Sequence, residues 1–225
     1  MGFSHTIHAF RCTDIEQFKS ALKETAAKHQ GKFAPRQDSN APENELLVGV
    51  GPKAITLFCR RAIYPFVRDV TSALGGVPCM VARIQDGSHW DYSIFRGFEH
   101  LDQFSTFPQY WENEDDPVTI LAKRGNPEMV SLIFDTPIDR FGPYLKHWRS
   151  GWDSETQSHK LEGKAFPHDR SEYGNYEQLW DFLDSIGIHD PASGRYSEII
   201  RWNLSLPDKS PVPLRRNWWQ RLLNR

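Results

Sequence analysis

The chain has 225 residues, a net charge of −2, and ordinary shares of hydrophobic (39%) and charged (25%) residues. These values are typical of a folded globular protein and exclude a collagen-like, coiled-coil or wholly disordered chain. A net charge near zero also argues against a surface built throughout for nucleic acid. The aromatic share is the unusual value, because 8 Trp, 7 Tyr and 14 Phe make up 13% of the chain.

The first 31 residues predict a strand followed by a helix. Residues 6–10 alternate in polarity, as a short strand does. Apolar residues then recur at helical spacing and predict a helix over 14–29. Thr13 and Glu16 have the spacing of a capping box at its start, and Gly31 stands where a helix ends.

The next segment is rich in predicted strands. A helix over 65–74 is expected to end at the glycines of positions 75 and 76. Short glycine-containing connections join the last three strands, which predicts an antiparallel meander near 79–105. The predicted strands are 46–50, 54–60, 79–85, 89–96 and 99–105.

After Pro108 the sequence becomes mostly helical in character. Segments 118–123 and 128–134 fit a helix or a strand equally well. Thr136 followed by Pro137 is typical of a helix start. The remaining expected elements are a polar surface loop over 150–174, a helix over 175–187 and a strand over 196–204.

This order of elements predicts an α+β fold in which helices pack on an antiparallel sheet. We expect one domain over residues 1–206, with a break into two lobes near residue 112 as the alternative. Residues 207–225 are expected to form a proline-containing linker and a basic, tryptophan-rich tail. Residues 201–225 hold six Lys and Arg against Asp208 alone, a net charge of +5, so the first 200 residues carry −7.

Targeting and redox signals point to the cytoplasm. The cysteines, Cys12, Cys59 and Cys79, are too few and too scattered for a disulfide framework. The chain begins without the apolar core of a signal peptide, and no apolar run approaches the ~20 residues of a membrane span. We therefore expect a cytoplasmic protein with buried thiols.

The densest aromatic segment is residues 86–111. On the predicted strand, Trp90 and Tyr92 share one face, and Asp91 lies on the other with His89 and Phe95. Apolar material on both faces predicts either helices on both sides of the sheet or an exposed binding surface. The rings are accordingly core residues, anchors for a protein partner, or a platform for stacked bases. The candidate anchors are Trp90, Tyr92, Phe104, Tyr110 and Trp111, with Asp91 and Asp102 setting polarity and register.

The same segment carries a resemblance. Trp90 and Tyr92 precede a turn at Arg96-Gly97, and the runs Asp102-Gln103-Phe104-Ser105 and Pro108-Gln109-Tyr110-Trp111 follow. This pattern resembles a hairpin of uncharacterised bacterial cytoplasmic proteins, some of them immunity-like or toxin-associated. The resemblance covers about 26 residues, implies a protein-binding role and carries over no functional residue.

No motif predicts a metal, cofactor or nucleophile site. The chain contains no His-Glu-x-x-His, no paired Cys-x-x-Cys, no Gly-x-Ser-x-Gly and no phosphate-binding loop. His159 and His168 share a polar loop with Asp169 and Glu172, a set that folding could bring together. We name no catalytic residue, no metal and no cofactor.

The C-terminal tail has a pattern of its own. Leucine, tryptophan and arginine recur at helical spacing after residue 213, and the adjacent Trp218 and Trp219 cannot face the same way. Such a segment can dock back on its own domain, bind a partner, or lie on an anionic membrane. We include Trp218 and Trp219 among the candidate binding residues.

Together these features predict a soluble interaction protein whose partner is another protein or a second copy of the chain. Nucleic acid and membrane are disfavoured as partners. One alternative is a small hydrolase or transferase whose His, Asp and Glu side chains converge only in the fold. The second alternative is single-stranded nucleic-acid binding through the aromatic rings and the basic tail.

Overall fold

The structure is a computed structural model. It describes residues 5–35, 45–59, 63–108, 117–148, 152–153, 158–159, 163–189 and 195–206. The predicted break near residue 112 and the predicted tail over 207–225 lie outside these residues.

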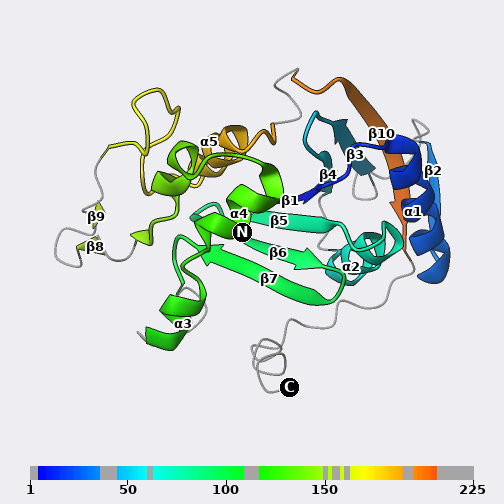
Figure 1. Cartoon of the computed structure of the whole chain (residues 1–225), viewed down its shortest axis with the longest axis horizontal. Coiled ribbons are helices and arrows are strands. Elements are labelled where there is room, and N and C mark those ends of the chain that lie inside the picture. Colours follow the sequence, from blue (N-terminus) through cyan, green and yellow to red (C-terminus); the bar gives the residue numbers. More distant parts are fainter. Residues whose placement is uncertain are drawn as a thin grey trace.

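Among the described residues, an antiparallel sheet of eight strands forms the centre of the fold (Figure 1). Its strand order is β2-β10-β3-β4-β1-β5-β6-β7, and every neighbouring pair is antiparallel. The predicted α+β class and the meander near 79–105 are confirmed. The strands are β1 (His5–Phe10), β2 (Lys32–Pro35), β3 (Glu45–Val50), β4 (Ile55–Cys59), β5 (Pro78–Gln85), β6 (His89–Arg96), β7 (Glu99–Ser105) and β10 (Glu198–Ser205).

Both segments that fitted helix or strand equally well are helices. Each begins at a proline, which lacks the amide hydrogen that a strand would need and suits the first helical turn. Asn126 caps the second of them by accepting a hydrogen bond from the amide of Met129 at 3.1 Å. The helices are α1 (Ile15–Lys28), α2 (Tyr64–Ala73), α3 (Pro117–Ala122), α4 (Pro127–Phe134) and α5 (Gln178–Ser185).

The remaining short elements lie between α4 and α5. The predicted helix start at Thr136-Pro137 leads into two 3-10 turns, η2 (Ile138–Arg140) and η3 (Gly142–Tyr144), rather than an α-helix. The predicted polar loop contains a two-stranded ribbon of β8 (Trp152–Asp153) and β9 (Ser158–His159).

Six elements form a split β-α-β unit within the sheet. With the short strand β2 left out, the chain runs β1-α1-β3-β4-α2-β5. The four strands lie side by side in the order β3-β4-β1-β5, and both helices pack on one face. The short strand β2 and the late strand β10 widen the sheet beyond β3, and the β6–β7 hairpin widens it beyond β5 (Figure 1).

Helices cover both faces of the sheet. Apolar residues on both faces of the predicted strand allowed either helices on both sides or an exposed binding surface, and the first of these expectations is confirmed. On one face, α1 and α2 pack over side chains of β1, β3, β4, β5 and β10. On the other, α4, α5 and η3 pack over β1, β5, β6 and β7. Alternation along β5 supplies both cores, because Cys79 and Val81 point to the first and Met80, Ala82 and Ile84 to the second.

The start of α1 differs from the capping box that the sequence indicates. Asp14, not Thr13, is the cap, and its Oδ1 accepts hydrogen bonds from the amides of Glu16 and Gln17, both at 3.0 Å. A carboxylate at this position also interacts favourably with the positive end of the helix dipole. Beyond the helix, Gln30 rather than Gly31 takes the left-handed conformation, with φ of 57°.

The aromatic rings of β6 join the sheet to α5. Phe182 stacks on Trp90 with ring centroids 5.2 Å apart, and on Tyr92 at 5.7 Å with the ring planes within 5° of parallel. Phe104 of β7 completes the group, with its centroid 5.0 Å from that of Trp90. Trp90, Tyr92 and Phe104 are each at most 1% exposed, so these rings belong to the core.

Replacing Trp90 with alanine should therefore act on stability. We expect the free energy of unfolding to fall by about 3–5 kcal/mol, the usual cost of truncating a buried aromatic side chain. Equilibrium urea denaturation followed by circular dichroism measures the change. The matched control is Phe98→Ala in the β6–β7 turn, where the ring is 71% exposed and the change should stay within about 0.5 kcal/mol. Equal effects of the two substitutions would contradict the packing described above.

Candidate functional site

The face of the sheet that carries α1 and α2 changes from apolar to polar along β5 and β6. Near α2 it is apolar, and the Arg68 guanidinium lies 4.7 Å above the ring of Phe95. Further along the same strands the side chains on this face become polar. Pairing across the strands places Arg83 opposite Asp91 and Gln85 opposite His89. This face of the sheet therefore has a polar region at the end of the β5–β6 pair that is farther from α2.

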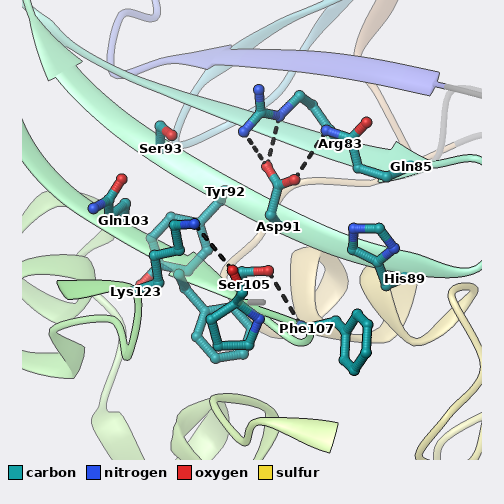
Figure 2. A pocket seen from close by; sticks show the side chains of 12 residues that line it. Arg83, Gln85, His89, Asp91, Tyr92, Ser93, Gln103, Ser105, Phe107 and Lys123 are labelled. Atoms are coloured by element: carbon teal, nitrogen blue, oxygen red, sulfur yellow. Dashed lines mark hydrogen bonds and ion pairs between the residues drawn. The ribbon is translucent and has the colours of Figure 1, made fainter. Parts of the chain in front are cut away.

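A hollow lies over this polar region (Figure 2). Its volume is about 470 Å³, including the part that opens to solvent. The lining comes from β5, β6, β7, the segment after β7 and the residue after α3. We call it the polar hollow; it is lined by Arg83, Gln85, His89, Asp91, Tyr92, Ser93, Gln103, Phe104, Ser105, Phe107, Pro108 and Lys123.

A partly buried ion pair lies in the polar hollow. Arg83 donates to Oδ1 of Asp91, from Nε at 2.6 Å and also from Nη2. Gln85 Nε2 donates to the other carboxylate oxygen at 3.0 Å. Both oxygens of Asp91 are thus engaged by neighbours on β5, and Figure 2 shows the two side chains reaching it from one side. The side chains of Arg83 and Asp91 are only 19% and 9% exposed, so the pair is partly desolvated.

His89 lies beside this pair and is almost fully buried. Burial is the main cause that lowers its pKa to about 4, and the nearby Arg83 charge acts in the same direction. The carboxylates of Asp91 and Asp86 oppose the shift but do not overcome it. His89 is consequently neutral at pH 7, with its Nδ1 2.9 Å from the hydroxyl oxygen of Ser88.

Lys123 closes the side of the polar hollow opposite His89 (Figure 2). Its Nζ donates to the carbonyl of Pro108 at 3.0 Å. Its own carbonyl accepts from the amide of Ser105 at 3.0 Å, which ties the residue to the edge of β7. The Nε2 atom of His147 lies 3.1 Å from the same carbonyl. This backbone anchoring brings the end of α3 against the sheet.

The candidate residues from the sequence divide between the two faces. Trp90, Tyr92 and Phe104 are core residues beneath α5, so the expectation that their rings are exposed anchors is wrong. Tyr110, Trp111, Trp218 and Trp219 lie outside the described residues.

The two candidate carboxylates, Asp91 and Asp102, lie on opposite faces of the sheet. Asp91 lies in the polar hollow, whereas Asp102 lies on the opposite face and holds the start of α4. Asp102 Oδ2 accepts from the Tyr92 hydroxyl at 2.8 Å and from the Asn126 amide at 3.1 Å. Burial raises the pKa of Asp102. Gly125 permits this contact, since its φ is +76° and a Cβ there would lie 2.8 Å from the Tyr92 oxygen.

Most residues that line the polar hollow were not predicted from the sequence. Arg83, Gln85, Ser93, Gln103 and Lys123 were not among the candidates. A signal for two of them was present, because Arg83 and Gln85 are polar positions at one end of an otherwise apolar strand that alternates with period two. Lys123 had no such signal, since only its hydrogen bonds to β7 bring it to the site.

Of the polar-loop set, His168 and Asp169 do meet, with Nε2 and Oδ1 3.9 Å apart. Asp169 also accepts from the Tyr144 hydroxyl at 2.6 Å and from the amide of Phe166 at 2.8 Å, and the side chain of His168 is 82% exposed. Within the described ranges, no group of three or more His, Cys, Asp or Glu is placed to hold a metal ion. In that same part of the chain, no helix has the length and apolar character needed to cross a membrane.

Comparison of the chain with protein-family models, with curated proteins and with solved structures finds no match.

Acid should weaken the fold through two buried histidines. Burial lowers the pKa of His8 on β1, as it does that of His89, to about 4 from 6.5. The unfolded chain binds more protons than the folded chain between pH 6.5 and 4, so stability falls as the pH drops through this window. Each histidine should contribute roughly 3 kcal/mol to the loss.

Urea unfolding at pH 7 and at about pH 4.5 tests this linkage. We expect His89→Gln to reduce the difference in unfolding free energy between the two pH values. His168→Gln, on an exposed side chain, is the control and should leave the difference unchanged. An unaltered difference in His89→Gln would rule out the contribution assigned to its burial.

A further prediction concerns the contribution of the Arg83–Asp91 ion pair to stability. Asp91→Leu should destabilise the fold by about 3 kcal/mol, because it leaves a partly buried guanidinium without its counter-charge. The double variant Arg83→Met/Asp91→Leu should recover most of that loss, since an apolar pair needs no compensation. Chemical denaturation of the two variants and the wild type measures both values. If the double variant is no more stable than Asp91→Leu, the charges are not coupled as described.

Proposed function

We propose that the chain acts by binding another protein, and that the binding surface consists of α3 and the polar hollow. The observation that carries the proposal is the exposure of α3. None of its six residues is buried, and the apolar side chains of Val118 and Leu121 are 73% and 60% exposed. These two residues are three apart and therefore lie on one side of the helix.

The position of α3 adds to this argument. In Figure 1, α3 lies beyond the end of β7 and apart from the other helices. Lys123 follows its last residue directly and lines the polar hollow. Apolar side chains thus adjoin a hollow with charged and hydrogen-bonding groups. Protein interfaces combine these two kinds of contact, with apolar side chains at the centre and polar groups around them.

Acid–base catalysis has weaker support in the polar hollow. A histidine that acts as a general base is usually oriented by a carboxylate or another acceptor. Both oxygens of Asp91 already accept from Arg83 and Gln85, and the Nδ1 of His89 faces Ser88 instead. The contacts of Asp91 therefore fit a role in holding the shape of the surface.

Single-stranded nucleic acid is supported less than a protein partner. Base stacking needs exposed rings, and Trp90, Tyr92 and Phe104 are enclosed by the fold. The positive charge of Arg83 is also largely offset by Asp91. Among the residues that line the polar hollow, Phe107 alone has a Phe, Tyr or Trp ring that is not buried, which is less than the row of exposed rings that base stacking uses.

A double substitution on α3 tests the proposal. The tagged wild-type chain is used to capture proteins from a lysate of its source cells, and the captured protein is purified and titrated by calorimetry. We expect Val118→Asp/Leu121→Asp to weaken binding by at least about tenfold, because it places two charges in the apolar part of the interface. Both positions are exposed, so unfolding stability should change by less than about 0.5 kcal/mol each.

The matched control is Leu132→Asp, which removes an apolar side chain that is 79% exposed on α4. It should bind as the wild type does. Light scattering of the purified chain, with and without the α3 substitutions, distinguishes a second copy of the chain from a different protein. Capture of the same proteins in equal amounts by the wild type and the α3 variant would refute the proposal.

A further inference from the structure

We propose that the guanidinium of Arg68, in the corner between α2 and the β6–β7 turn, binds a carboxylate group. Arg68 is not among the residues that line the polar hollow, so this site is a second one. The inference goes beyond the proposed function and does not depend on α3.

The corner is built by α2 and the two strands beside it (Figure 1). The Cζ atom of Arg68 lies 4.7 Å from the centre of the Phe95 ring on β6, and that centre lies 5.2 Å from the centre of the His100 ring on β7. The Gly97 amide donates to Thr71 Oγ1 at 2.8 Å, which ties the β6–β7 turn to α2. The guanidinium is therefore held at a defined place against the sheet.

The Arg68 guanidinium has no acceptor in the part of the chain that the structure describes. The side chain is half-buried and its Nε is covered by protein, yet no described group accepts a hydrogen bond from the guanidinium or forms an ion pair with it. The face of the Phe95 ring stabilises the positive charge but accepts none of the in-plane N–H groups. A partly desolvated cation without a counter-charge is costly, and such groups in proteins are normally paired.

Other half-buried cations of this protein follow that rule. Lys53 Nζ donates to two carbonyls and one hydroxyl at the end of α4, at 2.7 to 3.0 Å. Arg83 is paired with Asp91. Arg68 has a comparable degree of burial and lacks such partners, which points to a ligand as its acceptor.

The nearest carboxylate along the chain serves another contact. Asp69 accepts from Lys28 Nζ at 2.7 Å and lies 2.6 Å from Nε2 of His29, so it joins α2 to α1. On the other side, partial burial lowers the pKa of His100, and the charge of Arg68 acts in the same direction. The positive charge of Arg68 thus acts on the neighbouring strand.

A carboxylate is the anion that best suits a single guanidinium. The two terminal nitrogens, Nη1 and Nη2, carry parallel N–H groups that match the two oxygens of one carboxylate. A neutral amide would leave the charge uncompensated, and a cation would be repelled. A phosphate dianion brings two charges to a group that supplies one.

Nuclear magnetic resonance titration of the purified full chain with sodium acetate tests the inference. The signals to follow are the side-chain Nε–H of Arg68 and the backbone amide of Gly97. We expect both to shift and to saturate with a dissociation constant on the order of 10 mM, because one charge-assisted contact to a small ligand supports weak binding. Acetamide and inorganic phosphate, at the same ionic strength, should shift both signals far less.

Variants assign the effect to Arg68, with the Gly97 amide as the probe. Arg68→Gln should weaken acetate binding by at least about fivefold, and Arg68→Lys should give an intermediate affinity because it keeps the charge but not the paired N–H groups. Arg140→Gln is the matched control, since this arginine is exposed in η2, and it should leave binding unchanged. Thermal unfolding of each variant verifies that the fold is intact.

The source of the carboxylate is tested with the protein partner of α3. If Arg68→Gln also weakens binding of that partner, the carboxylate belongs to an acidic residue of the partner. If acetate binding is lost while partner binding is unchanged, the site takes a free organic acid.

Three results would overturn the inference. They are equal shifts with acetate and acetamide, acetate binding that survives Arg68→Gln, and tighter binding of phosphate than of acetate. None of them bears on the role of α3, which the Val118→Asp/Leu121→Asp variant tests separately.

Discussion

The arrangement of this protein depends on the alternation of side chains along β5 and β6. Over part of their length both strands are apolar on both faces, so each face must be covered by helices. The covering helices come from different parts of the chain, α1 and α2 on one face and α4 and α5 on the other. Where one face becomes polar, at Arg83, Gln85, His89 and Asp91, the apolar cover is no longer required. The polar hollow lies at that transition.

Much of the sheet could be predicted because its signals are local. The alternation and the short glycine turns define β6 and β7, and the structure has both strands with the predicted bounds. The four-residue strand β2 was not predicted, because only its pairing with β10, more than 160 residues later, makes it a strand. Candidate residues in the meander were found by composition, which detects aromatic rings but not whether a helix covers them. Asp91 was identified, whereas Lys123 depends on a hydrogen bond to β7 that no local pattern encodes.

The proposed binding surface follows from how the fold uses the residues around β7. Pairing with residues 123–125 protects the end of this edge strand, since Ser105 donates to the Lys123 carbonyl and Gly125 donates to that of Gln103. The same bonds fix the end of α3 against the polar hollow. Protection of a sheet edge and presentation of α3 are thus two results of one set of backbone hydrogen bonds.

The place of β10 has a consequence for the order in which the protein can assemble. This strand, the last in the described chain, lies between β2 and β3 and pairs with both, so that Trp202 is opposite Pro35 on one side and Leu46 on the other. During synthesis, β2 has no neighbour in the sheet and β3 keeps an open edge until residue 205 has left the ribosome. Local hairpins such as β6–β7 can form much earlier. A chain that stops before β10 would expose the backbone edge of β3 and the ring of Phe33. An incomplete chain released from the ribosome would therefore be prone to aggregate.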